Sequence, residues 1–233
     1  MNLSEKYGVS FEEAKVIEEL KSILGKPIPY VEEINWNTFA IKIVNKQITG
    51  FGLYNCELTT LPEPILKLKS LYRLNLGKNQ LATLPVSFGN LKALKWLSLS
   101  ENQLATLPES FGNLKSLQKI WLYRNQITTL PESFGNLKSL QELYLDDNQL
   151  KTLPESFGNL KSLQKLWIFY NQLKSLPESF GNLKSLQELF LRGNQLRTLP
   201  ESFGALISLQ KLSLRDNQLT TLPESFGNLK ALD

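Results

Sequence analysis

Apolar residues recur in a fixed order that repeats every 23 residues along most of the chain, and each unit reads approximately LKSLQxLxLxxNQLxTLPESFGN. Seven such units begin at Leu68, Leu91, Leu114, Leu137, Leu160, Leu183 and Leu206. A degenerate unit, residues 45–67, precedes them and keeps the apolar positions, and residues 229–233 begin a ninth unit. Because one unit cannot bury its own leucines, neighbouring units must stack, which predicts a solenoid.

The first half of each unit predicts a short strand. Ile120 and Leu122 alternate with Lys119 and Trp121, which is the period of two expected of a strand with one buried face. Asn125 follows, at a position where an amide can cap backbone groups as the chain leaves the strand. The same position holds Asn79, Asn102, Asn148, Asn171, Asn194 and Asn217.

The second half of each unit predicts a turn away from the sheet. The Leu130-Pro131 step favours an extended leucine and removes a backbone donor, so the strand cannot continue. Phe134 then returns to the core, and its equivalents are expected to stack as a spine. They are Phe88, Phe111, Phe157, Phe180, Phe203 and Phe226. Gly135 and its counterparts are predicted to adopt a positive φ. The fold class is therefore α/β, with a parallel sheet on a concave side and irregular or short helical segments on a convex side.

Residues 1–44 lack the repeat and are predicted to cap the solenoid. Ser10 and Glu13 form a capping box, followed by apolar residues at helical spacing up to Gly25. These residues are Phe11, Ala14, Ile17, Leu20 and Leu24. Residues 39–44 and 47–51 then flank a two-residue connection typical of a β-hairpin. The predicted division is an N-terminal cap, 1–44, of a helix and the first hairpin strand, and a solenoid, 45–233, of eight units plus a truncated ninth.

The motif LxxLxLxxNxLxxLP, with Leu-Pro before a phenylalanine, resembles the intracellular 23-residue class of leucine-rich repeat proteins. The resemblance covers residues 45–233. Within that class, the repeats are similar to those of Ras-group-related leucine-rich repeat scaffolds and to the repeat domains of Roco-type GTPases. The resemblance therefore implies a leucine-rich repeat solenoid that binds proteins. A small GTPase is one kind of partner that the resemblance implies.

Composition narrows the range of functions. The chain has no histidine, which removes Ser-His-Asp and Cys-His nucleophile pairs and histidine metal ligation. Cys56 is the only cysteine, so neither an intramolecular disulfide nor a cysteine cluster for zinc can form. Glycine-rich phosphate loops are also missing. We therefore predict a protein that is not an enzyme and that uses no metal or cofactor.

The first 15 residues, MNLSEKYGVSFEEAK, lack the pattern of a secretory signal, and no apolar run is long enough for a membrane helix. These features predict a cytoplasmic protein that does not associate with membranes, and the resemblance adds a signalling role as a scaffold.

The outward-facing strand positions vary from unit to unit, and four consecutive units carry aromatic residues there. We name Trp121, Tyr144, Trp167 and Phe190 the aromatic ladder; at about 4.8 Å per strand it extends about 14 Å. Neighbouring positions add four flanking rings, Trp96, Tyr123, Phe169 and Tyr170. Such rings can simply stabilise a sheet, but eight of them exceed the apolar surface that a monomer usually exposes. We predict a partner-binding site formed by these rings.

Charged residues around the rings are mixed in sign, and the net charge is only +4. Mixed charges favour a protein or an extended peptide as the partner over nucleic acid, because the acids would repel phosphates. Asp146, Asp147 and Arg192 are expected to set specificity. As an adjacent pair of acids, Asp146 and Asp147 are more typical of a solvated surface than of a catalytic site.

Two other functions remain open from the sequence. The chain could be a regulatory or sensor segment of a larger multidomain protein such as a GTPase, continuing beyond Asp233. Alternatively, it could assemble or self-associate through its last repeat, where Leu222, Phe226 and Leu229 are expected to form an uncapped edge.

Overall fold

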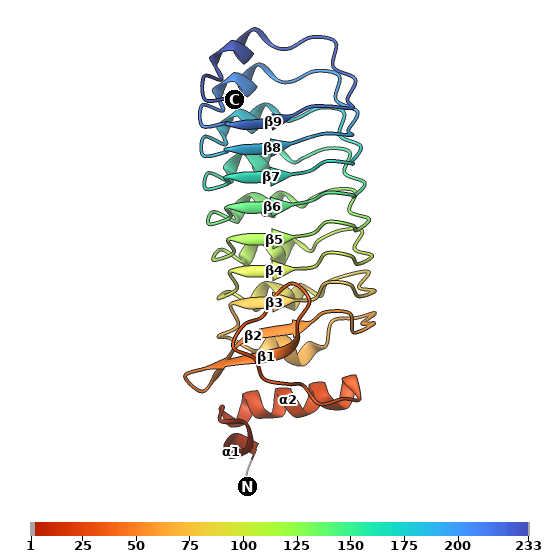
Figure 1. Ribbon diagram of the computed structural model, residues 1–233, viewed down its shortest axis with the longest axis vertical. Coiled ribbons are helices and arrows are strands. Elements are labelled where there is room, and N and C mark those ends of the chain that lie inside the picture. Colours follow the sequence, from red (N-terminus) through yellow and green to blue (C-terminus); the bar gives the residue numbers. More distant parts are fainter. Residues whose placement is uncertain (1–2, 233) are drawn as a thin grey trace.

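A computed structural model describes residues 3–232, and its central feature is a single sheet that runs the length of the molecule (Figure 1). Within the described residues the strands follow chain order in the sheet. They are β1 (Phe39–Val44), β2 (Gln47–Leu53), β3 (Arg73–Asn75), β4 (Trp96–Ser98), β5 (Lys119–Trp121), β6 (Glu142–Tyr144), β7 (Lys165–Trp167), β8 (Glu188–Phe190) and β9 (Lys211–Ser213). β1 pairs antiparallel with β2, and every later pair is parallel. The predicted leucine-rich repeat solenoid is confirmed.

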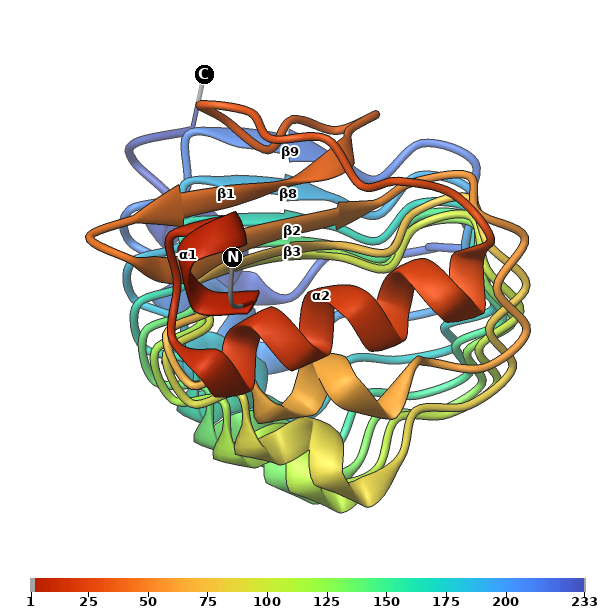
Figure 2. The same ribbon diagram turned by 90° about the horizontal axis from the view of Figure 1, so that it is seen from below.

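A short 3-10 helix follows each of the strands from β2 to β9 on the opposite side of the solenoid (Figure 2). These helices are η1 (Glu63–Lys67), η2 (Val86–Asn90), η3 (Glu109–Asn113), η4 (Glu132–Asn136), η5 (Glu155–Asn159), η6 (Glu178–Asn182), η7 (Glu201–Ala205) and η8 (Glu224–Asn228). Each begins immediately after an extended proline, such as Pro131 with φ of −67°. The proline ends the extended segment, and the tight 3-10 turn returns the chain to the core within five residues.

The phenylalanine spine forms as predicted. Rings of successive units are nearly parallel, with centroids 5.9 to 6.4 Å apart, and the rings from Phe88 to Phe203 are fully buried. Paired strands lie about 4.8 Å apart. Units are therefore more closely spaced at the sheet than at the spine, which makes the strand face the concave side.

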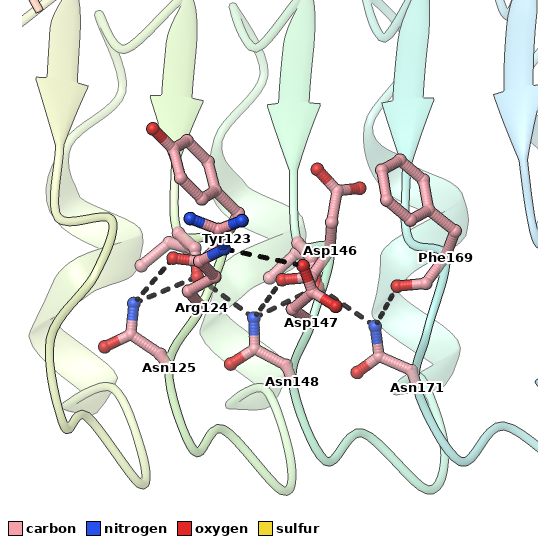
Figure 3. A network of polar contacts seen from close by, with 10 residues as sticks. Tyr123, Arg124, Asn125, Asp146, Asp147, Asn148, Phe169 and Asn171 are labelled. Carbon is pink, nitrogen blue, oxygen red and sulfur yellow. Dashed lines mark hydrogen bonds and ion pairs between the residues drawn. The ribbon is translucent and has the colours of Figure 1, made fainter. Parts of the chain in front are cut away.

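The asparagine that ends each strand connects two neighbouring units. The Nδ2 group of Asn125 donates to the carbonyls of Leu99 and Leu122, both at 3.0 Å, and its Oδ1 accepts from the Leu104 N–H at 3.0 Å. Asn148 donates in turn to the carbonyl of Leu122, so that each such carbonyl receives two amide donors (Figure 3). The predicted capping role is confirmed. We call this chain of hydrogen bonds the asparagine ladder.

The glycine after each spine phenylalanine serves a different purpose from the one predicted. Among the described glycines, positive φ occurs only at Gly8, Gly25 and Gly193, so the prediction for Gly135 is wrong. A Cβ on Gly135 would instead lie 2.2 Å from the carbonyl oxygen of Ser156 in the next unit. Close approach of two backbones is what requires glycine here. The left-handed residue in these units is the one before the ladder asparagine, as at Arg124 and Asp147.

The N-terminal segment forms α1 (Leu3–Tyr7) and α2 (Phe11–Leu24), and α2 lies across the first unit (Figures 1 and 2). The Ser10 Oγ accepts from the Glu13 N–H at 3.3 Å, and Gly25 ends the helix at φ of 63°. The Glu13 carboxylate also accepts from the Ile48 N–H at 3.2 Å, which ties α2 to β2. The predicted helix is confirmed.

Two single-residue predictions about this fold are wrong. Phe11 is 51% exposed instead of packed in the apolar stripe of α2, and Val16 is buried in its place. At the last unit, Leu222 is 49% exposed as expected, whereas Leu229 is buried. The predicted two-residue hairpin connection is confirmed, since Asn45 and Lys46 both adopt positive φ and the turn forms without glycine.

Replacing Asn148 with alanine should lower the free energy of unfolding by about 2–4 kcal/mol. The change leaves the Ile127 N–H without its partner and removes one of the two amide donors from the carbonyls of Leu122 and Leu145. Urea denaturation measures the loss. Gln149→Ala, at the adjacent exposed position, is the control and should change stability by about 0.5 kcal/mol or less. Equal stabilities of the two variants would contradict the role given to the asparagine ladder.

Gly135→Ala should destabilise the protein by about 1–3 kcal/mol, because the added methyl group meets the Ser156 carbonyl oxygen. Gly227 occupies the same position in the last unit, where a Cβ would meet nothing within 4 Å. Thermal melts of Gly135→Ala and Gly227→Ala therefore separate the steric cost from the intrinsic effect of alanine. A comparable shift in Tm for both variants would show that close approach is not what the glycine provides.

Candidate binding surface on the concave face

The aromatic ladder lies on the concave face with its rings in mutual contact. The parallel register aligns Trp121 with Tyr144, Tyr144 with Trp167, and Trp167 with Phe190. Their ring centroids are 5.3, 5.0 and 5.5 Å apart; the first pair is stacked and the other two meet edge to face. The strand register therefore brings together four residues that are separated by 23 positions in the sequence.

The flanking rings extend this surface in two directions. Trp96 contacts Trp121 at 4.7 Å, and Phe169 contacts both Trp167 at 6.3 Å and Tyr170 at 5.5 Å. Among the eight rings only Tyr170 is well exposed, at 45%. The other rings are half-buried, because they cover part of one another. The exposed apolar area is accordingly smaller than the sum of the individual rings.

Charged side chains on this face pair between neighbouring units. Glu142 pairs with Lys119 at 2.9 Å, and Asp147 pairs with Arg124 at 3.8 Å. Further along the solenoid, Glu188 pairs with Lys165 and Lys211, and Asp216 pairs with Arg192 at 2.7 Å. Pairs this exposed contribute little to stability, but they neutralise the acids of the surface.

Asp146 differs from these acids because the same position in the adjacent units holds Tyr123 and Phe169. Its carboxylate lies between the two rings (Figure 3). The residue is only 6% exposed, and its Oδ1 is buried without a hydrogen-bond partner. The expectation of a solvated pair of acids therefore holds for Asp147, whose side chain is 45% exposed, and is wrong for Asp146.

The surroundings raise the pKa values of two side chains in this region, Asp146 and Tyr144. Burial, followed by repulsion from Asp147, raises the pKa of Asp146 to about 7. Burial, together with a hydrogen bond donated to Glu142, raises the pKa of Tyr144 well above its ordinary value. Perturbed carboxyl groups of this kind gather at functional sites, since ion pairing or a ligand can offset their cost.

A hollow of about 610 Å³ opens in the middle of the surface, and we call it the central hollow. It is lined by Trp121, Tyr123, Arg124, Tyr144, Asp146, Asp147, Trp167 and Phe169. The Nε1 group of Trp167 is buried without an acceptor, so the surface holds one unpaired donor as well as one unpaired acceptor.

Two smaller hollows continue from the central hollow along the concave face. One of about 220 Å³ lies among Trp167, Phe169 and Phe190, and one of about 290 Å³ lies beside Tyr170 and Arg192. Of the predicted site residues, all but Trp96 line one of the three hollows. Arg124, Ser213 and Arg215 were not predicted. Arg124 could have been found from its place directly before Asn125, where the left-handed backbone brings it onto the rim.

Other parts of the described chain are weaker candidates for a functional site. A hollow of about 760 Å³ lies beside the end of α2 and the half-buried Cys56, where burial raises the pKa of the thiol. A protonated thiol is a poor nucleophile. Residues 3–232 contain no cluster of three or more acidic or cysteine side chains that could hold a metal ion, and no helix among them has the length and apolar character to cross a membrane.

Comparison with known families gives a consistent result over most of the chain. Residues 47–126, 87–173 and 120–192 match the family described as leucine-rich repeat region. Residues 185–206 and 208–229 match the family described as leucine rich repeat. No curated protein sequence matches the chain.

Solved structures with the same fold include three that are about one-third identical in sequence. A leucine-rich repeat protein of Leptospira interrogans is 33% identical, with a TM-score of 0.61 over 78% of this chain and 58% of that one. The PEPR1–AtPEP1 complex is 33% identical, with a TM-score of 0.72 over 86% of this chain and 34% of that one.

The third structure is the leucine-rich repeat ectodomain of the Arabidopsis thaliana membrane receptor kinase GASSHO1/SCHENGEN3, in complex with CASPARIAN STRIP INTEGRITY FACTOR 2. It is 34% identical, with a TM-score of 0.66 over 82% of this chain and 23% of that one. The chain thus spans between about a quarter and three-fifths of these structures.

Asp146→Asn should stabilise the protein, and more so at pH 8 than at pH 4. The folded protein holds the Asp146 proton up to about pH 7, whereas the unfolded chain loses it near 3.8, so wild-type stability falls as the pH rises through this window. Asparagine removes that penalty, which amounts to about 1–4 kcal/mol at pH 8.

Urea denaturation at both pH values, compared with the exposed and paired control Asp216→Asn, measures this difference. A constant difference between wild type and Asp146→Asn at pH 4 and pH 8 would contradict the raised pKa of Asp146.

Proposed function

The chain belongs to the leucine-rich repeat family, and from this premise we propose that it is a non-catalytic interaction module that binds an extended peptide or protein segment on its concave face. The observation that carries the proposal is the central hollow. It combines half-buried aromatic rings with a buried carboxylate oxygen that has no partner inside the protein.

The arrangement of the rings suits recognition by contact. Aromatic side chains provide a large share of the binding energy at protein interfaces, above all where polar groups surround them. Here each ring is fixed by the next one and by the strands beneath, whose ends are joined by the asparagine ladder. A surface that is already ordered avoids much of the entropic cost of binding.

The dimensions of the surface favour an extended segment. The aromatic ladder spans β5 to β8, about 14 Å at strand spacing, which corresponds to about four or five residues of extended chain. We assign Trp121, Tyr144, Trp167 and Phe190 as the central anchors, with the flanking rings around them. Asp146, Asp147 and Arg192, which lie along the same hollows, set specificity.

The comparisons support this type of function. The PEPR1 and GASSHO1/SCHENGEN3 structures are both complexes, with AtPEP1 and with CASPARIAN STRIP INTEGRITY FACTOR 2 respectively. These two complexes support a binding function for the repeats of this chain. A small GTPase as the partner, a cytoplasmic location and a place within a larger protein stay predictions from the sequence.

Trp167→Ala should weaken the binding of a concave-face peptide by about 2 kcal/mol or more, close to thirtyfold, and Trp121→Ala should have a similar effect. Peptides selected from a random displayed library against the wild-type protein serve as probes, with fluorescence polarisation as the measurement. Trp36→Ala is the matched control, because Trp36 is exposed, contacts Tyr54 and lines none of the three hollows.

Thermal melts of all variants establish that each one is folded. If folded Trp121→Ala and Trp167→Ala proteins bound the selected peptides as tightly as the Trp36→Ala protein, the concave face would not be the binding site.

A further inference from the structure

We propose that the central hollow binds the guanidinium group of an arginine side chain supplied by the partner, with Asp146 as its counter-ion. The inference rests on the proposed function, because it names the chemistry that the concave face recognises in a peptide. It follows from the charge pattern, the burial and the ring geometry of the hollow.

The charge pattern leaves one acid without a cation. In the described units from β5 to β9, the acids of the strand face other than Asp146 each pair with a lysine or arginine of a neighbouring unit. These pairs are Glu142–Lys119, Asp147–Arg124, Glu188–Lys165 and Asp216–Arg192. A cation that pairs with Asp146 in the same way would have to stand at position 123 or 169. The chain has tyrosine and phenylalanine there, so the cation must come from outside.

The burial of Asp146 shows that its carboxyl group lies in a preformed, desolvated position and not on a solvated surface. A carboxylate removed from water is costly unless it is paired or hydrogen-bonded. Asp146 is 6% exposed, its Oδ1 has no partner, and it lies on the wall of the central hollow between the rings of Tyr123 and Phe169 (Figure 3). Arg124, the cation that lines the same hollow, is paired to Asp147, and its side chain is 65% exposed.

The rings favour guanidinium over ammonium. Trp121, Tyr144 and Trp167 line the same hollow, and aromatic faces attract cations. Guanidinium is planar, stacks on such faces and is more weakly hydrated than the lysine ammonium group, so its transfer into a half-buried aromatic site costs less. It can also donate to the Asp146 Oδ1 while its face remains against a ring.

Binding of this kind should depend on pH, because the cation requires an ionised Asp146. Burial holds the Asp146 pKa near 7 in the free protein, so affinity should rise between pH 6 and pH 8. The charged and titratable groups that line the hollow together with Asp146 are Tyr123, Arg124, Tyr144 and Asp147. Of these, Asp147 raises the Asp146 pKa by its charge, and backbone hydrogen bonds from Phe169 and from Asp146 itself partly offset the increase.

The experiment uses peptides selected from a random displayed library, resynthesised with their arginine kept or replaced by the neutral isostere citrulline or by lysine. Citrulline should weaken binding to the wild-type protein by about tenfold or more, and lysine should also bind more weakly than arginine. Asp146→Asn, which removes a buried charge and so remains folded, should bind the arginine peptide as weakly as wild type binds the citrulline peptide. Its affinity should also be independent of pH.

Glu188→Gln is the matched control, since it removes an acid of the same face that already pairs with Lys165 and Lys211, outside the assigned site, and it should bind like wild type. Three results would overturn this inference and leave the proposed function intact. The peptides that depend on Trp121 and Trp167 for binding would lack arginine, would prefer lysine in its place, or would bind the Asp146→Asn protein normally. A library that yields no peptide dependent on Trp121 and Trp167 would instead overturn the proposed function itself.

Discussion

The asparagine ladder is the constraint on which the rest of this structure depends. Each ladder amide donates to carbonyls of two consecutive units and accepts an N–H from the earlier one, so the hydrogen bonds run without interruption from Leu53 to Leu214. Backbone groups at the strand ends are buried and must be paired, and one asparagine per unit pairs several of them. The units are thereby held in one register, in which residues 23 positions apart lie beside each other.

This register places the positions that differ between units side by side on the concave face. Where a position carries opposite charges in neighbouring units, ion pairs form across the concave face, as between Lys119 and Glu142. Where it carries aromatic residues, the rings pack into the aromatic ladder. Asp146 is the exception, since its column offers rings in place of cations, and burial of its carboxylate lowers stability. A destabilised polar group in a preformed apolar hollow is typical of a binding site, in which the partner supplies what the fold does not.

Most of the fold could be predicted from the sequence, because a strict repeat of leucine, asparagine and phenylalanine positions allows one stacking solution. The failures concern contacts between units, which the pattern within one unit does not contain. Gly135 is required by the backbone of the next unit and not by its own φ. At the site, the sequence placed the rings together but not the burial of Asp146. That burial depends on which side chains flank it at positions 123 and 169, and so could have been found by comparing positions between units.

The central claim is that the concave hollow around Asp146 is a preformed site for a cationic, extended partner. A crystal structure of the protein with an arginine-containing peptide selected against it tests this most directly. The account predicts a peptide lying across β5 to β8, with a guanidinium nitrogen about 2.7–2.9 Å from the Asp146 Oδ1. A peptide bound on the convex side, or one on the concave face that leaves the Asp146 carboxylate without a partner, would contradict it.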